Sequence, residues 1–274
     1  MGRRLAARKG GAMPIRLALL DVDGTLRQGR QWNPGAVELI RLLHGAGAVV
    51  ALCSGRGATS MRRITTDLPE VSYFASASGS AVWRRASAGW ELVAHRPLPR
   101  AIIERAVCVA GELGLDLWAY TDEQWLITRH TPIIDRETWL VEDRATVADF
   151  HAAPRIGKML FLGAGDRLDE LKELVHSPET VLVQSGPHYA DIVTREAFAA
   201  KGGDVVLAET GIGWGEVLAV GDSENDLGML GSAAFAIVVG NHLDPARTPA
   251  PQGTMRLAVP DTQAALETVR GLLS

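Results

Sequence analysis

Short apolar runs that end abruptly in polar residues recur at both ends of the chain, and they constrain its fold more than any other feature. Runs at 15–20 and 48–53 are each followed by a helical stripe, and a third run lies at 73–77. Continuous apolar runs of this length are typical of strands buried on both faces of a parallel sheet. The order strand, helix, strand, helix, strand predicts a parallel sheet with right-handed crossovers.

The same rhythm returns toward the C-terminus. Residues 202–211 predict a helix, and the apolar runs 217–220 and 234–239 predict two more buried strands. Residues 262–273 carry apolar side chains at helical spacing and predict a closing amphipathic helix. We therefore expect both ends of the chain to contribute to one α/β sheet.

The middle of the chain follows a different pattern. Between residues 84 and 187, helices are separated by short strands in which apolar and polar side chains alternate, which predicts an α+β module. We expect an α/β fold with a Rossmann-like parallel-sheet core at 14–83 and 188–274 and an α+β cap domain inserted at 84–187. Residues 1–13 are expected to form a disordered basic tail, with Met13 as an alternative start.

Two clusters of carboxylates directly follow predicted buried strands. The first contains Asp21 and Asp23 in Asp-Val-Asp-Gly-Thr, and the second contains Asp222 and Asp226 in Gly-Asp-Ser-Glu-Asn-Asp. The carboxyl ends of parallel strands meet at the edge of an open α/β sheet where ligands bind. Four carboxylates gathered there would repel one another unless a cation lay among them. Mg²⁺ suits such a site because it prefers oxygen ligands and retains waters or phosphate oxygens.

The spacing within the first cluster also carries information. Side chains two residues apart in extended backbone point the same way, so Asp21 and Asp23 can flank one bound group. Turn-forming Asp, Gly and Asn residues would explain either cluster alone. Both clusters together, each after an apolar run, favour a catalytic site over two unrelated turns.

With these motifs, the chain resembles the haloacid dehalogenase superfamily, in the branch of Cof-type phosphatases that carry a large inserted cap of the C2 type. The resemblance covers nearly all of residues 13–274. It implies that Asp21 is a nucleophile that forms an aspartyl-phosphate, and that Asp23 is the general acid and base. It also implies that Mg²⁺ is held by the Asp21 side chain, the Asp23 backbone carbonyl and Asp222, with support from Asp226.

The resemblance further implies a set of phosphate-binding residues. Ser54 and Gly55 lie in Cys-Ser-Gly-Arg, which matches the second motif of the family, and Lys201 in Lys-Gly-Gly matches the third. Thr25 and Asn225 lie in the same loops as the acidic residues. We expect these five residues to surround the transferred phosphoryl group.

Substrate specificity is expected to reside in the cap, which would close over the leaving group while the core holds the phosphate. Cationic side chains that could meet a second anionic group there are Arg129, His130, Arg155, Lys158 and His188. Several tryptophans also fall in or near the cap, where aromatic rings can stack on sugars or pack sheets against helices. The expected substrate is a phosphorylated sugar or a similar small phosphomonoester.

The residues leave other functions open. A sugar phosphomutase of the same superfamily would share the opening motif, and a ligand-binding protein could keep such a site as a vestige. The branch usually has Asn-Gly-Ala after the third strand, whereas this chain has Ser-Gly-Ser at 78–80, which leaves the leaving-group contacts there open. No Gly-x-Gly-x-x-Gly follows the first strand, which argues against a dinucleotide-binding enzyme.

Composition limits the partners of the chain. The formal net charge is −4, and no run of eighteen apolar residues occurs, so neither nucleic acid nor a membrane is an expected partner. The basic N-terminus lacks the apolar segment of a signal peptide, and we expect a cytoplasmic protein. The expected partner is a small phosphorylated metabolite, bound by a monomer or homodimer.

Overall fold

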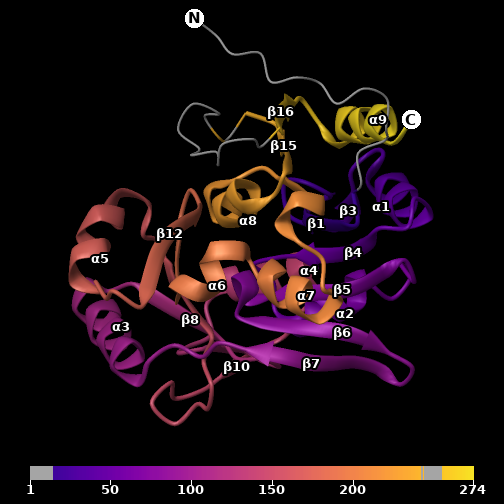
Figure 1. The fold of residues 1–274 in the computed structure, drawn as a ribbon. Coiled ribbons are helices and arrows are strands. Elements are labelled where there is room, and N and C mark those ends of the chain that lie inside the picture. The colour runs from indigo at the N-terminus through magenta and orange to yellow at the C-terminus, as the bar shows by residue number, and fades with distance from the viewer. Residues whose placement is uncertain (1–14, 242, 244–254) are drawn as a thin grey trace, which may run out of the picture.

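The computed structural model describes residues 15–241, 243 and 255–274. The basic tail expected at 1–13 lies outside the described residues. Figure 1 shows two modules, each built on its own sheet and covered by its own helices.

The larger sheet has eight strands in the order β16-β15-β14-β1-β4-β5-β6-β7. The first six of these strands are parallel, and β6 and β7 continue the sheet in antiparallel fashion at one edge. Their bounds are Met255–Val259 (β16), Phe235–Val239 (β15), Val217–Gly221 (β14), Leu17–Asp21 (β1), Val49–Cys53 (β4), Val71–Ser76 (β5), Ala81–Ala86 (β6) and Gly89–His95 (β7).

Strand β1 shows why the sequence gives this arrangement. All five of its residues are buried. Ala18 and Leu20 belong to one apolar cluster and Leu17 and Leu19 to another, on opposite faces of the sheet. Burying each leucine stabilises the fold by roughly 1.5–3 kcal/mol. A strand of this composition requires a sheet covered by helices on both sides, as predicted.

Helices cover both faces of the larger sheet. One face packs against α1 (Ala36–Gly45), α2 (Ala58–Ile64) and α9 (Thr262–Leu273). The other packs against α7 (Gly203–Thr210) and α8 (Leu227–Ser232). The expected α/β fold with a parallel-sheet core is therefore confirmed.

The second sheet has six strands in the order β10-β9-β8-β11-β13-β12. Helices α3 (Arg100–Leu113) and α5 (Leu168–Leu174) lie on its outer side, away from the larger sheet (Figure 1). The strand bounds are Ala145–Val147 (β10), Trp125–Ile127 (β9), Asp116–Tyr120 (β8), Lys158–Leu162 (β11), Tyr189–Thr194 (β13) and Thr180–Gly186 (β12).

The change from one sheet to the other does not occur at the predicted residues 84 and 187. The hairpin β6–β7 pairs with β5 and so extends the larger sheet to His95. Its Trp83, Trp90 and Leu92 pack against the core of that sheet, which explains why the hairpin belongs there. Strand β13 pairs with β11 and β12 of the second sheet. We therefore place the inserted module at residues 96–194.

Shorter elements complete the fold. Helix α4 (Pro132–Val141) belongs to the inserted module, and α6 (Arg195–Ala200) leads back to the core. A small hairpin follows the first acidic cluster, formed by β2 (Arg27–Gln28) and β3 (Gln31–Trp32). Within the described parts of the chain, no helix is both long and apolar enough to traverse a lipid bilayer.

Candidate active site

The predicted site residues lie at the carboxyl ends of neighbouring parallel strands. Asp21 ends β1, Asp222 follows β14 and Ser54 follows β4, and these three strands are adjacent in the sheet. Since parallel strands end at the same edge, residues about 200 positions apart in the chain converge here.

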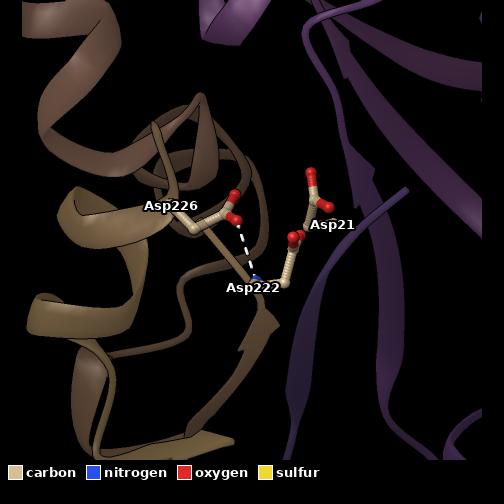
Figure 2. Close-up of side chains that lie close together, drawn as sticks. All are labelled: Asp21, Asp222 and Asp226. Atoms are coloured by element: carbon tan, nitrogen blue, oxygen red, sulfur yellow. Dashed lines mark hydrogen bonds between the residues drawn. The ribbon is translucent and has the colours of Figure 1, made fainter. Parts of the chain in front are cut away.

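Three of the four predicted aspartates form one cluster, which Figure 2 shows. Asp21, Asp222 and Asp226 are all buried, and each offers a carboxylate oxygen within 4.8 Å of those of the other two. Oδ2 of Asp226 accepts hydrogen bonds from the backbone N–H groups of Asp222 and Ser223, each at 3.1 Å. These bonds hold the second acidic loop in shape.

Lys201 connects the two acidic loops. Its Nζ lies 2.7 Å from Oδ1 of Asp21 and 2.5 Å from Oδ1 of Asp226, and it donates to Oδ1 of Asn225 at 3.3 Å. The residue ends α6 with a φ of 48° and is followed by Gly202 at a φ of 85°. This left-handed turn directs the side chain into the sheet edge, where only 1% of the residue is exposed.

The charges of this cluster do not balance. Burial raises the pKa of Asp21 well above its ordinary value, and the Asp226 carboxylate raises it further, while Lys201 opposes the rise. Burial and Asp226 raise the pKa of Asp222 to about 6. Burial would lower the pKa of Lys201, but the two carboxylates beside it outweigh burial and raise it. When all three carboxylates are ionised, they exceed the one ammonium by two negative charges, and this repulsion favours proton retention unless a cation binds.

The cluster fits a hard divalent cation. Oδ2 of Asp21 is buried and has no hydrogen-bond partner, so one oxygen of the cluster is available to a ligand. Asp222 keeps its orientation because Thr25 donates a hydrogen bond to its Oδ1 at 3.1 Å. An oxygen-only donor set with two excess negative charges suits Mg²⁺ or a similar ion.

Asp23 is held apart from this cluster. It forms a two-ended ion pair with Arg56, at 2.7 Å from Nε to Oδ2 and 2.6 Å from the terminal nitrogen to Oδ1. The Arg56 guanidinium is buried and also donates to the Gly29 carbonyl at 3.0 Å. The Asp23 side chain is 49% exposed. Arg56 was given no role from the sequence, although it belongs to the Cys-Ser-Gly-Arg motif that signalled Ser54.

A cavity of about 1180 Å³ connects the acidic cluster to the inserted module. The predicted residues that line it are Asp21, Asp23, Gly55, Lys158, Asp222 and Asn225. Thr25, Ser54, Lys201 and Asp226 are buried behind the cavity wall. The hydroxyl of Ser54 accepts the Arg56 backbone N–H at 3.2 Å, so the structure gives Ser54 a role in shaping the loop.

Four of the five predicted cap cations lie elsewhere in the described chain. Arg129 is exposed and pairs with Asp116 at 2.7 Å, and His130 lies 3.3 Å from Asp135. Arg155 donates to Nδ1 of His95 at 3.1 Å, and His188 is exposed. These side chains do not line the cavity. Basic residues usually remain exposed to solvent, and the sequence alone does not distinguish exposed basic residues from those that line a cavity.

Lys158 is the exception, and it reaches the cavity with a partner. Its Nζ lies 2.6 Å from Oδ2 of Asp191 and donates to the Gly55 carbonyl at 3.2 Å. Both residues belong to the inserted module, Lys158 on β11 and Asp191 on the neighbouring β13. The hydrogen bond from Lys158 to the Gly55 carbonyl connects this buried ion pair to the loop after β4. Asp191 neutralises the cation that the sequence suggested for a second anionic group.

The sequence as a whole matches a known family. The family model of haloacid dehalogenase-like hydrolases matches residues 18–252. The chain belongs to this family. In this haloacid dehalogenase-like hydrolase, the two acidic loops and Lys201 converge at one edge of the larger sheet.

Individual proteins are similar to this chain along most of their length. The 5-amino-6-(5-phospho-D-ribitylamino)uracil phosphatase YcsE of Bacillus subtilis is 25% identical over 84% of this chain and 86% of its own. The phosphoglycolate phosphatase of Aeropyrum pernix is 27% identical over 91% of this chain and 94% of its own. The solved structure of the HAD subclass IIB sugar phosphatase BT4131 superposes with a TM-score of 0.79 at 15% identity, covering 94% of this chain and 99% of that chain. At 15% identity, this structural similarity shows a shared fold and nothing further.

Proposed function

We propose that this hydrolase is a Mg²⁺-dependent phosphatase that removes phosphate from a small phosphomonoester by way of a phosphoryl group carried on Asp21. The observation that supports this most directly is the state of the Asp21 carboxylate. Lys201 holds one oxygen at 2.7 Å, whereas the other is buried at the cavity wall without a hydrogen-bond partner. Such an oxygen keeps a lone pair for attack on phosphorus.

The metal-binding part of the proposal uses Asp21 and Asp222 as side-chain ligands, together with the backbone carbonyl of Asp23. When bound, Mg²⁺ would neutralise charge on the phosphoryl oxygens. Asp226 would support the site, because its two oxygens are already occupied by Lys201 and by backbone N–H groups. Lys201 would balance the charge of Asp21 before and after phosphoryl transfer.

The proposed reaction has two steps. The free oxygen of Asp21 attacks phosphorus, and the bond between phosphorus and the leaving oxygen breaks while Asp23 supplies a proton to that oxygen. A water molecule then attacks the phosphorus of the acyl phosphate and loses its proton to Asp23. Inorganic phosphate leaves, and Asp21 is regenerated as a carboxylate.

Arg56 would serve as a positioning residue for Asp23 in this scheme. Its buried guanidinium is held by the Gly29 carbonyl and by Oγ of Ser60, at 3.0 and 3.3 Å, so it offers Asp23 a fixed partner. Asp23 nevertheless stays half exposed and lines the cavity, where its carboxyl group can leave the arginine and, once protonated, meet the leaving oxygen.

The similar proteins support a phosphatase but do not share one substrate. YcsE is named for a phosphorylated ribitylamino-uracil, and the Aeropyrum enzyme for phosphoglycolate. We favour a phosphorylated sugar or related metabolite for this chain. A sugar phosphomutase would use the same nucleophile but return the phosphoryl group to the sugar instead of transferring it to water.

The test is phosphate release from a panel of sugar phosphates, p-nitrophenyl phosphate and phosphoglycolate, with Mg²⁺ and with EDTA. We expect turnover only with Mg²⁺, and its return when Mg²⁺ is restored. The variant Asp21→Asn should lose roughly a thousandfold or more in kcat, because it removes the nucleophile.

Asp169→Asn is the matched control, because this aspartate is 96% exposed and its one ion pair within the described part of the chain is with Lys172. It should retain the full rate. Formation of an isomeric sugar phosphate without inorganic phosphate would indicate a mutase. Near-normal turnover by Asp21→Asn, or no turnover by the unmodified protein, would contradict the proposal.

A further inference from the structure

One face of the second sheet forms the wall of the cavity opposite the aspartates. Side chains on a strand alternate between faces, and on β8 Leu117 and Ala119 point into the core beneath α3 and α5. Trp118 and Tyr120 therefore point to the other face, which we call the roof. The roof consists of Trp118, Tyr120, Lys158, Leu160, Tyr189 and Asp191, and all six line the cavity.

The register of the sheet orders the roof by distance from the core loop. Lys158 contacts the Gly55 carbonyl and pairs in register with Tyr120. Leu160 and its register partner Trp118 lie two residues farther, about 7 Å along the strand. Tyr189 pairs with Leu162, four residues or about 13 Å beyond Lys158. The roof is thus polar near the phosphate end, apolar in the middle and polar again at the far end.

A buried carboxylate marks the far end. Glu137 of α4 lines the cavity and is 9% exposed. The hydroxyl of Tyr189 donates to its Oε1 at 3.2 Å, and burial together with this carboxylate raises the pKa of Tyr189 to about 12. No other donor among the described residues reaches Glu137. A buried carboxylate with a single neutral donor has unused acceptor sites that face the cavity.

Most cations that line the cavity are already paired with carboxylates and are not free for a second anionic group. Lys158 is paired with Asp191, and Arg56 with Asp23. Arg27 and Arg30 lie 3.5 and 3.1 Å from Glu142. Arg136 also lines the rim but is exposed, whereas its neighbour Glu137 is buried. The buried charge at the far end is therefore negative, which favours donors over an anionic leaving group.

We propose that Glu137 selects the substrate by accepting hydrogen bonds from hydroxyl or amino groups of a ring-sized leaving group that lies across Trp118 and Leu160. The substrate class is a phosphomonoester of a polyhydroxylated or amino-bearing ring, such as a sugar. A two-carbon acid such as the leaving group of phosphoglycolate is too short to reach Glu137. This inference rests on the proposed phosphatase activity and assigns its specificity to one residue.

The test compares two substrates of similar size, a hexose 6-phosphate and p-nitrophenyl phosphate. The nitrophenyl ring fills the apolar middle of the roof but carries no hydrogen-bond donor. Glu137→Gln removes the charge and replaces one acceptor oxygen by a donor. It should lower kcat/KM for the best hexose phosphate by roughly ten- to hundredfold, the range expected for losing a hydrogen bond to a charged group. The same variant should leave p-nitrophenyl phosphate hydrolysis within about twofold. Tyr189→Phe should also lower the ratio of kcat/KM for the hexose phosphate to kcat/KM for p-nitrophenyl phosphate, by a smaller factor.

Asp135→Asn is the matched control, because Asp135 is on the same helix, and its side chain is 76% exposed. This variant should leave kcat/KM unchanged for both substrates. An equal loss on both substrates, no loss on either, or a preference of the unmodified enzyme for phosphoglycolate would overturn the inference while leaving the phosphatase intact. Absence of phosphate release from every substrate would instead overturn the proposed function, and this inference with it.

Discussion

At the scale of single residues, Gly24 shows how a missing side chain shapes the acidic site. It has a φ of +86°, and a Cβ built on it would lie 2.3 Å from Oδ2 of Asp222. The left-handed backbone costs a residue with a side chain about 1–2 kcal/mol. The contact would in addition displace the Asp222 carboxylate. Gly24 thus lets the chain turn after β1 and leaves room for an oxygen of the proposed metal site.

We predict that Gly24→Ala weakens Mg²⁺ binding by roughly ten- to hundredfold, the range seen when the support of a metal ligand is disturbed. The measurement is the Mg²⁺ concentration that gives half-maximal phosphatase rate. Gly47→Ala is the control, because Gly47 has a φ of +87° and nothing within 4 Å of an added Cβ. Both variants should lose similar stability, but only Gly24→Ala should shift the Mg²⁺ requirement. Equal shifts would show that backbone strain alone is responsible.

At the scale of elements, the sequence predicted the uniformly apolar strands of the core but missed one strand and one helix beside the cavity. β1 and β14 are continuous apolar runs and were predicted with their acidic loops. β13 was missed because Asp191 interrupts its apolar pattern, and only the tertiary structure shows that Lys158 neutralises it. Helix α4 was missed although Pro132 at its first turn is a helix-start signal.

The cavity residues were harder to predict than the acidic loops for a related reason. Alternation along β8 shows that Trp118 and Ala119 face opposite ways, but it does not show which face another module covers. The position of Glu137 depends on how α4 packs across the second sheet, which is a long-range property. The motifs therefore located the phosphate end of the site, and the structure was needed for the leaving-group end.

The ion pair between β11 and β13 gives a prediction at this scale. Asp191 is fully buried, and the Lys158 side chain is 4% exposed. Lys158→Met should destabilise the protein by about 3–5 kcal/mol, because it leaves a buried carboxylate without its cation. Adding Asp191→Asn should recover much of that loss, since both charges are then absent. Urea unfolding of the two single variants and the double variant measures the coupling, and additive losses would contradict a direct interaction.

At the scale of the whole molecule, the cavity belongs to neither module alone. Asp21 and Asp222 contribute from the larger sheet, and Trp118 and Tyr189 from the second. Contacts between the modules hold this arrangement: Arg62 pairs with Glu123 at 2.6 Å, and Oγ of Ser60 donates to the Val141 carbonyl. The order of the segments predicted an insertion, but its limits required the pairing of β6, β7 and β13.

The acidic cluster also links the stability of the whole protein to pH and metal. Asp222 has a pKa of about 6 in the folded protein, against an ordinary value of 3.8. Between these two pH values the folded state retains a proton that the unfolded state has lost, so stability falls as pH rises through this window. Asp21, whose pKa is also raised, acts in the same direction. The metal-free protein should therefore gain stability when the pH falls from 7 to 5, by roughly 1 kcal/mol from Asp222, because only part of its titration falls in this window.

Mg²⁺ should reverse this dependence. Metal ligands bind as carboxylates, so protons compete with the ion, and Mg²⁺ should raise the unfolding temperature more at pH 7 than at pH 5. Measuring that temperature with Mg²⁺ and with EDTA at each pH cancels titrations elsewhere, such as that of His95, whose pKa is lowered by burial. Asp222→Asn should reduce both the Mg²⁺ effect and its pH dependence, whereas Asp169→Asn should change neither. Any cation held by these carboxylates must first displace the protons that burial retains on them. If Mg²⁺ raised the unfolding temperature equally at both pH values, protons and Mg²⁺ would therefore not compete for the same site, which would contradict the prediction.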